Sequence, residues 1–128
     1  MALIAPQIAL PACCSIAPAD TTVSKPLRTC VTAAGEVVGR IRACSTDSAT
    51  QTLQFIRTSG SVDYIIGESQ VLLGAGTNGT TPYKDLLADI NQGNPVTLAN
   101  GEVLKVRSKT TVTAATKIDV TAEAVALG

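Results

Sequence analysis

The amino-acid sequence predicts an all-β protein, a single β-sandwich or jelly-roll-like domain with an extended N-terminal arm. Short stretches of alternating apolar and polar residues recur along the chain, which is the pattern of half-buried strands. Turn residues separate these stretches at near-regular intervals, so we expect seven to nine strands. Aromatic residues make up only 2% of the 128 residues. The core must therefore be built from valine, isoleucine, leucine and alanine.

Residues 1–26 form an apolar, proline-containing segment that we interpret as an extended arm, and residues 27–128 as the β-sandwich domain. Prolines at positions 6, 11, 18 and 26 interrupt any helix there. An apolar arm needs a surface to cover it. It either packs along its own domain or reaches neighbouring subunits, and we expect the second. We do not expect a signal peptide, because no basic residues precede the short apolar run and prolines interrupt it.

The first half of the domain contains two predicted strands and a hairpin. Residues 27–31 lead into an Ala-Ala-Gly turn, and residues 36–44 follow as a strand. In that strand the expected buried face holds Val37, Ile41 and Ala43, and the opposite face holds Arg40, Arg42 and Cys44. Residues 52–57 and 62–66 flank a Thr-Ser-Gly-Ser turn and predict a hairpin. We expect Gly67 to open a link towards residues 71–73.

Residues 74–79 read Gly-Ala-Gly-Thr-Asn-Gly and match the glycine pattern of dinucleotide-binding loops. We interpret them as an ordinary loop, because no acidic residue lies about 20 residues further on and no crossover helices are predicted. Residues 83–90 leave two alternatives open. They form either an extended segment or a helical turn with one apolar face, made of Tyr83, Leu86, Leu87 and Ile90.

The C-terminal part contains the clearest strands. Residues 95–98 predict a short strand, and Asn100-Gly101 is a turn dipeptide. Leu104 and Val106 then alternate with Lys105 and Arg107. Over residues 117–127 one face collects only apolar side chains, namely Ile118, Val120, Ala122, Ala124 and Ala126. Two such half-polar runs indicate an antiparallel sheet with one face in solvent.

The composition argues against catalysis and against several classes of partner. The chain has no histidine, which is the commonest general base and zinc ligand. Asp85 and Asp89 are expected on a solvated face. We therefore expect no enzyme activity, no cofactor and no small-molecule substrate. Ten basic and ten acidic residues give zero net charge, and no basic stripe or run of about 20 apolar residues indicates nucleic acid or a membrane as partner.

Four cysteines, Cys13, Cys14, Cys30 and Cys44, are the candidate disulfide residues. No C-x-x-C pair occurs among them, so we expect no metal site. Adjacent residues of an extended chain point to opposite sides. Cys13 and Cys14 are therefore expected to face two different surroundings. Four free thiols remain the alternative to disulfides.

The order of these segments resembles small β-sandwich structural proteins of tailed bacteriophages, in particular capsid decoration (cement) proteins. The resemblance covers roughly residues 30–127. It rests on the strand and polar loop at residues 40–47, the strand at 52–57, the Gly-Thr-Asn and Pro-Tyr-Lys segments within 76–84, and the terminal strands. The family implies homotrimers on the capsid surface, with terminal arms that clamp neighbouring major capsid subunits, and no catalytic residues. The cysteine content departs from the family.

The resemblance implies a structural virion protein that decorates and stabilises a bacteriophage capsid. Its partners would be the major capsid protein and its own copies, and its location the capsid surface. A virion persists in oxidising surroundings. We therefore expect Cys13 or Cys14 to form a disulfide with Cys30 or Cys44 of another chain. The alternatives are a phage neck or tail component and a secreted, disulfide-stapled β-sandwich that binds a glycan or protein.

Overall fold

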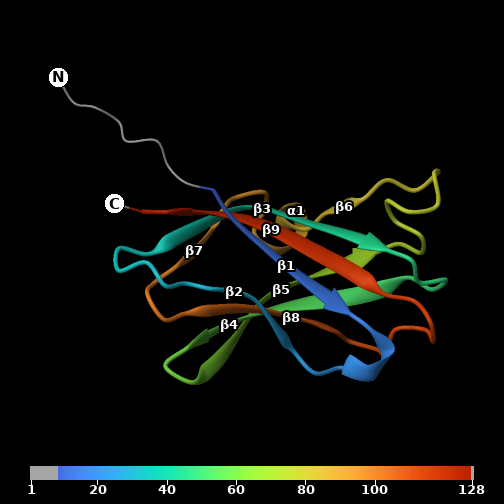
Figure 1. The fold of residues 1–128 in the computed structure, drawn as a ribbon, viewed down its shortest axis with the longest axis horizontal. Helices are drawn as coiled ribbons and strands as arrows, with labels where there is room; N and C mark the ends of the chain where they lie inside the picture. The colour runs from blue at the N-terminus through green and yellow to red at the C-terminus, as the bar shows by residue number, and fades with distance from the viewer. Residues whose placement is uncertain (1–8, 128) are drawn as a thin grey trace.

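The computed structural model describes residues 9–127, which fold into two antiparallel sheets packed face to face (Figure 1). Sheet A has the order β1 (Ala9–Ile16), β9 (Ile118–Ala126), β3 (Glu36–Ser45), β6 (Lys84–Asp85), and β7 (Val96–Leu98) also pairs with β3. Sheet B has the order β2 (Lys25–Thr29), β8 (Val103–Ser108), β4 (Gln51–Ser59), β5 (Val62–Val71). Two short helical turns complete the described part, η1 (Pro18–Asp20) and α1 (Leu87–Ile90). The predicted all-β sandwich is confirmed.

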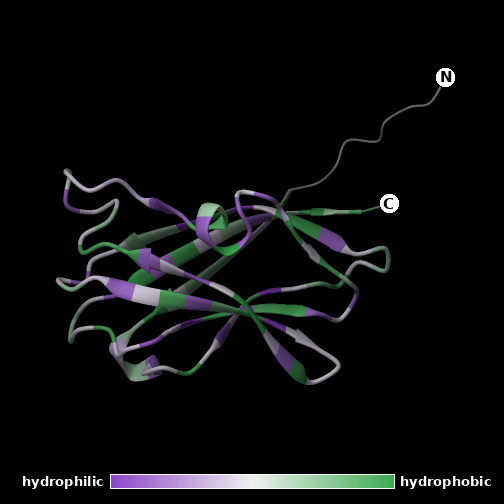
Figure 2. Ribbon diagram, turned by 180° about the vertical axis from the view of Figure 1, so that it is seen from behind, coloured by the Kyte–Doolittle hydropathy of each residue, from purple (hydrophilic) through white to green (hydrophobic). Residues whose placement is uncertain are grey.

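The two terminal strands have the predicted alternation but not the predicted relationship. The inward face of β9 is buried at Ile118, Val120, Ala122 and Ala124. The inward face of β8 is buried at Leu104 and Val106. The two strands do not pair with each other, because β8 lies in sheet B and β9 in sheet A. Figure 2 shows the resulting alternation of hydrophilic and hydrophobic residues along the strands.

The N-terminal segment is not wholly an arm outside the sandwich. Residues 9–16 form β1, which pairs with β9 of the same chain over its full length. Leu10, Ala12 and Cys14 pack against the core, and Ile16 is buried within it. Pro11 is tolerated because β1 lies at the edge of sheet A, where a missing N–H removes no ladder bond. The expected contacts of residues 1–8 with neighbouring subunits lie outside the described residues.

The predicted faces of β3 are wrong at its start. Val38 is fully buried, whereas Val37 is only half-buried. The cause is a register shift between Val38 and Arg40 in the pairing with β9. An extra residue in a strand reverses the faces on one side of the bulge. Ile41 and Ala43 lie inward as predicted, and the same shift turns the carboxylate of Glu36 into the interior.

The predicted hairpin is confirmed as β4 and β5, although β5 continues through Gly67 to Val71. Gly67 opens no link, because residues 67–71 stay paired with residues 51–55 of β4. Both alternatives for residues 83–90 occur in succession. The short strand β6 is followed by one helical turn, α1, in which Leu87 and Ile90 are buried. Leu86 is buried too, whereas Tyr83 is exposed.

A single apolar core fills the space between the sheets. Phe55 of β4 is the largest fully buried side chain, and aliphatic residues from both sheets surround it. None of the helical turns within residues 9–127 is long and apolar enough to span a bilayer.

Candidate functional site

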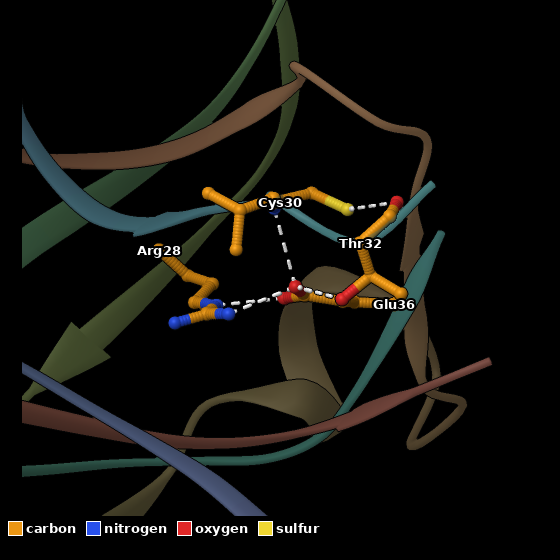
Figure 3. A network of polar contacts seen from close by, with 5 residues as sticks. Arg28, Cys30, Thr32 and Glu36 are labelled. Carbon is orange, nitrogen blue, oxygen red and sulfur yellow. Dashed lines mark hydrogen bonds and ion pairs between the residues drawn. The ribbon is translucent and has the colours of Figure 1, made fainter. Parts of the chain in front are cut away.

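A buried ion-pair network joins the two sheets at one end of the sandwich (Figure 3). Arg28 of β2 donates from Nε to Oε1 of Glu36 at 2.7 Å and from Nη2 to Oε2 at 2.8 Å. Thr32 Oγ1 and the Val31 amide donate to the same Oε2 at 2.9 and 3.3 Å. Cys30 lies beside the network, with its Sγ 3.7 Å from the Thr32 carbonyl oxygen. Both carboxylate oxygens of Glu36 are thus engaged by protein donors.

The geometry of this network makes Glu36 a fixed anion. The hydrogen bonds from Arg28, with smaller contributions from Thr32 and Val31, hold the pKa of Glu36 at about 2 despite its burial. The same contact raises the pKa of Arg28. Because the donors come from β2 and the following loop while Glu36 belongs to β3, the network fixes sheet B to sheet A. We interpret it as a stabilising contact rather than a reaction site.

A second buried carboxylate, Asp47, lies at the opposite end of the sandwich, in the loop between β3 and β4. Its Oδ1 accepts from the Ala49 amide at 2.9 Å. Its Oδ2 accepts from Gln51 Nε2 at 2.8 Å and from the Thr113 amide at 3.1 Å. Burial raises the pKa of Asp47, but the hydrogen bonds from Thr113, Ala49 and Gln51 outweigh it and lower the pKa overall. Asp47 therefore joins the β3–β4 loop to the β8–β9 loop.

The four predicted disulfide residues are not brought together within one chain, and all four are free thiols. Cys13 is exposed and Cys14 half-buried, as expected for adjacent residues of a strand. Burial raises the pKa of the Cys14 thiol. Cys30 is only 1% exposed and so is inaccessible to a cysteine of another chain. Cys44 is half-buried, and a Cβ atom on Gly76 would meet its Sγ at 2.7 Å.

The glycine-containing loop at residues 74–79 is not built as a phosphate cradle. Asn78 Oδ1 accepts from the Thr80 and Thr81 amides at 2.9 and 2.7 Å, so these donors are used inside the loop. The Gly76 amide donates to the Thr81 carbonyl at 2.7 Å. The close approach to Cys44 and a φ of +71° explain why a glycine occupies position 76. The interpretation as a structural loop agrees with these contacts.

The acidic pair Asp85 and Asp89 lies in solvent, as predicted. Asp85 accepts from the Leu87 amide at 3.1 Å, at the start of α1. Asp89 accepts from Ser69 Oγ at 2.7 Å and pairs with Lys84 Nζ at 3.0 Å, and these two contacts lower its pKa. Within residues 9–127 no group of three metal-ligating side chains comes together. Both aspartates thus make local contacts that organise β6 and α1.

Exposed apolar side chains form two groups that are candidates for contact with other proteins. The first group lies on β5, where Val62 and Tyr64 project to one face and Ile65, which is 66% exposed, projects to the other. Leu72 and Leu73 follow β5 and are also exposed. The sequence pattern did not identify the first group, because an exposed isoleucine in a strand has the same local spacing as a buried one. The spacing of inward-facing residues along β5 changes at the register shift between Phe55 and Ile56 in its pairing with β4.

A search against protein-family models finds no match, and no curated protein matches the sequence either. A search of solved structures does find similar folds. One is a chain of the capsid asymmetric unit of cyanophage Pam1, with a TM-score of 0.51 and 14% sequence identity. The similarity covers 99% of this chain and 94% of the Pam1 chain. The two chains share a fold over nearly their whole lengths.

Proposed function

We propose that this protein is a structural component of a bacteriophage virion that decorates the capsid and stabilises it. The fold similarity to a chain of a phage capsid asymmetric unit is the observation on which the proposal depends, because it spans both chains almost completely. The absence of histidine from the sequence also favours a role through contact rather than chemistry. In this proposal the protein binds as a homotrimer between subunits of the major capsid protein.

The proposed mechanism is burial of apolar surface at many equivalent positions. Exposed side chains such as Val62, Tyr64 and Ile65 would leave water when the protein binds the shell. Apolar surface contributes roughly 25 cal/mol for each Å² removed from water. A small contribution from one molecule is multiplied over the shell, which raises the temperature at which the capsid opens.

The test uses virions of the phage that encodes this chain, prepared with and without it. We expect the protein in purified virions by mass spectrometry and on the outer capsid surface by electron cryo-microscopy. Virions without the chain should release DNA at a lower temperature, and added protein should restore the wild-type value. Its absence from purified virions would contradict the proposal.

Deletion variants separate the role of the N-terminal residues from that of the domain. Removing residues 1–8 keeps β1 intact, so the protein should fold while its binding to virions weakens. Removing residues 1–25 also removes β1 and the buried Ile16, so it is a test of folding only.

Density at the neck or tail instead of the capsid surface would favour the alternative of a neck or tail component. The alternative of a disulfide-stapled secreted module requires bonds within the chain, and the four thiols are free.

A further inference from the structure

The open edge of β1 differs from the other sheet edges formed by residues 9–127. β2 has Lys25, Pro26 and a bulge at its edge. β5 has a bulge, while β6 is only two residues long and β7 only three. Charges, prolines, bulges and short length all prevent edge strands from pairing with other chains. β1 has eight residues, no charged side chain and an uninterrupted register with β9, and its one proline, Pro11, removes a single N–H from the open edge.

Two observations show which backbone groups of β1 face this open edge. Pro11 has no N–H to donate to β9. The Ser15 carbonyl accepts from Lys25 Nζ at 2.6 Å. Alternate residues of an antiparallel strand direct their N–H and C=O groups to the same side. Odd-numbered residues of β1 therefore face the open edge. Between residues 11 and 15, the groups at this edge that no residue of the described range 9–127 pairs with are the N–H of Cys13 and Ser15 and the C=O of Pro11 and Cys13.

The pairing on the far side of sheet A gives the same result independently. The Leu86 amide donates to the Ile41 carbonyl at 3.0 Å, so odd-numbered residues of β3 in this region face away from β9. Arg42 then bonds to β9 opposite Thr121. The neighbouring residue Ala122 must face β1, where it lies opposite Ala12. Even-numbered residues of β1 thus face β9, and Cys13 faces outward.

We propose that β1 pairs edge to edge with β1 of a second copy of this chain, antiparallel across a twofold axis at Cys13. Each Cys13 N–H then donates to the Cys13 carbonyl of the other copy. Each Ser15 N–H donates to the Pro11 carbonyl of the other copy. In this register, the N–H that Pro11 lacks would have donated to the Ser15 carbonyl of the other copy. That carbonyl already accepts a hydrogen bond from Lys25 of its own chain, so the missing donor leaves no acceptor unmatched. The edge is therefore complementary to itself in this register.

Neighbouring registers leave groups unmatched. Placing Pro11 opposite Cys13 leaves each Cys13 carbonyl without a donor. Placing Cys13 opposite Ser15 makes the incoming N–H compete with Lys25. The ladder between the two copies would end at Ala17, because the Ala17 amide already donates to Asp20 Oδ2 of its own chain at 2.8 Å. The register centred on Cys13 is the one in which the free donors and acceptors between residues 11 and 15 are all satisfied.

The side chains agree with this pairing. Pro11, Cys13 and Ser15 are uncharged and project to the outer face of sheet A. Ala12 and Cys14 are half-buried on the inner face, and a second β1 would cover them further. The nearby charges of Lys25 and Asp20 form an ion pair at 3.2 Å, so like charges do not face each other across the junction. The proposal does not depend on the virion role, and in a trimer this contact would link one trimer to the next.

The test is disulfide formation at the twofold axis. Residues opposite each other in such a pair have Cα atoms about 5.5 Å apart, within the range of roughly 4.4–6.8 Å for a disulfide. The full chain is treated with oxidised glutathione. Two Cys13 thiols form one disulfide, and their two electrons and two protons convert one oxidised glutathione to two molecules of glutathione. We expect a dimer on non-reducing electrophoresis, with a Cys13–Cys13 peptide by mass spectrometry.

Matched variants test the register. Cys13→Ser should abolish the dimer. Cys13→Ser with Ser15→Cys keeps an exposed thiol on β1, but the two Cα atoms would be roughly 14 Å apart, so no dimer should form. Cys13→Ser with Pro11→Cys should likewise give none alone. Mixing the two double variants should restore the dimer, because position 11 of one copy faces position 15 of the other. Equal cross-linking by the Ser15→Cys variant alone would overturn the proposal.

Sedimentation in reductant measures the association without any disulfide. Cys13→Lys places like charges at the axis and should lower the association constant at least tenfold. Thr97→Lys, on β7 of the same sheet but far from β1, is the control and should leave it unchanged. Circular dichroism checks that both variants are folded. No self-association of the wild type, or no effect of Cys13→Lys, would overturn the proposal and would favour a strand of a different protein at this edge.

Discussion

The two buried carboxylates, at opposite ends of the sandwich, are stabilised in different ways. Glu36 is 0% and Asp47 1% exposed, so both have lost nearly all contact with water. Glu36 is compensated by a cation, because Arg28 binds both of its oxygens. Asp47 accepts hydrogen bonds only from the neutral groups of Ala49, Gln51 and Thr113. A buried charge is thus tolerated here with or without an opposite charge, provided that its oxygens are hydrogen-bonded.

The largest expected effect is that of Glu36→Ala. The variant leaves the partly buried guanidinium of Arg28 without its anion, and should lower the free energy of unfolding by about 3–5 kcal/mol. Urea denaturation measures the change. The control is Arg28→Met with Glu36→Leu, which replaces both charges by apolar groups and should cost much less. If Glu36→Ala were as stable as the double variant, the ion pair would not be what holds the sheets together.

The pH dependence should follow from the lowered pKa of Glu36. Its folded pKa is about 2 and its ordinary value 4.5, so its contribution is complete above pH 4.5 and is lost as pH falls towards 2. The difference between the two values corresponds to about 3 kcal/mol of unfolding free energy. Asp47 acts in the same direction below its ordinary value of 3.8. Acid titration of unfolding should show a steeper loss for the wild type than for the double Arg28 and Glu36 variant.

Asp47→Asn should have a smaller effect than Glu36→Ala. The new amide group places a donor where Oδ1 or Oδ2 now accepts, so at least one buried donor, such as the Thr113 amide, loses its partner. The expected loss is about 2 kcal/mol, the typical cost of an unsatisfied buried polar group. Thermal and urea unfolding measure it, with Ser48→Ala, an exposed neighbour, as the unchanged control. A loss equal to that of Glu36→Ala would mean that the cation adds nothing.

Glu123→Ala should have the smallest effect. Glu123 lies on the outer face of β9, with side chains of Arg40 and Arg42 each 3.9 Å away. Its side chain is 50% exposed, and ion pairs in water contribute little. We expect a change below about 0.5 kcal/mol in the same denaturation experiment. A loss of more than 1 kcal/mol would show that exposed and buried carboxylates on this sheet do not differ as proposed.

Strand periodicity predicted the elements better than their arrangement. β8 and β9 were evident because their inward residues are uniformly apolar. The sequence did not show that these two strands belong to different sheets. Strands of both sheets have the same alternation, and the choice of pairing partner depends on contacts between residues distant in sequence. The faces at the start of β3 were wrong because Val37 and Val38 are both apolar, so the bulge leaves no local sign.

The polar sites were less predictable still. Nothing around Glu36 indicates burial, and its partner Arg28 lies across a loop in the other sheet. Asp47 depends on Thr113, which is close to it only after β8 and β9 have taken their places. The cysteines were visible in the sequence, but their accessibility was not. Cys30 is inaccessible because the core closes around it, whereas Cys13 is exposed because its side chain projects to the outer face of sheet A.

The pairing of β1 with β9 brings the two ends of the described chain together. Ala9 lies opposite Val125, and Figure 1 shows the start of β1 and the end of β9 on the same side of the sandwich. Chains with adjacent ends tolerate circular permutation. A short peptide linking the two ends, with new termini opened at Gly60 in the β4–β5 turn, should therefore preserve the sandwich. Peptides joined directly before Ala9 and after Leu127 would emerge side by side, which makes this fold a carrier for paired epitopes or for two halves of a reporter.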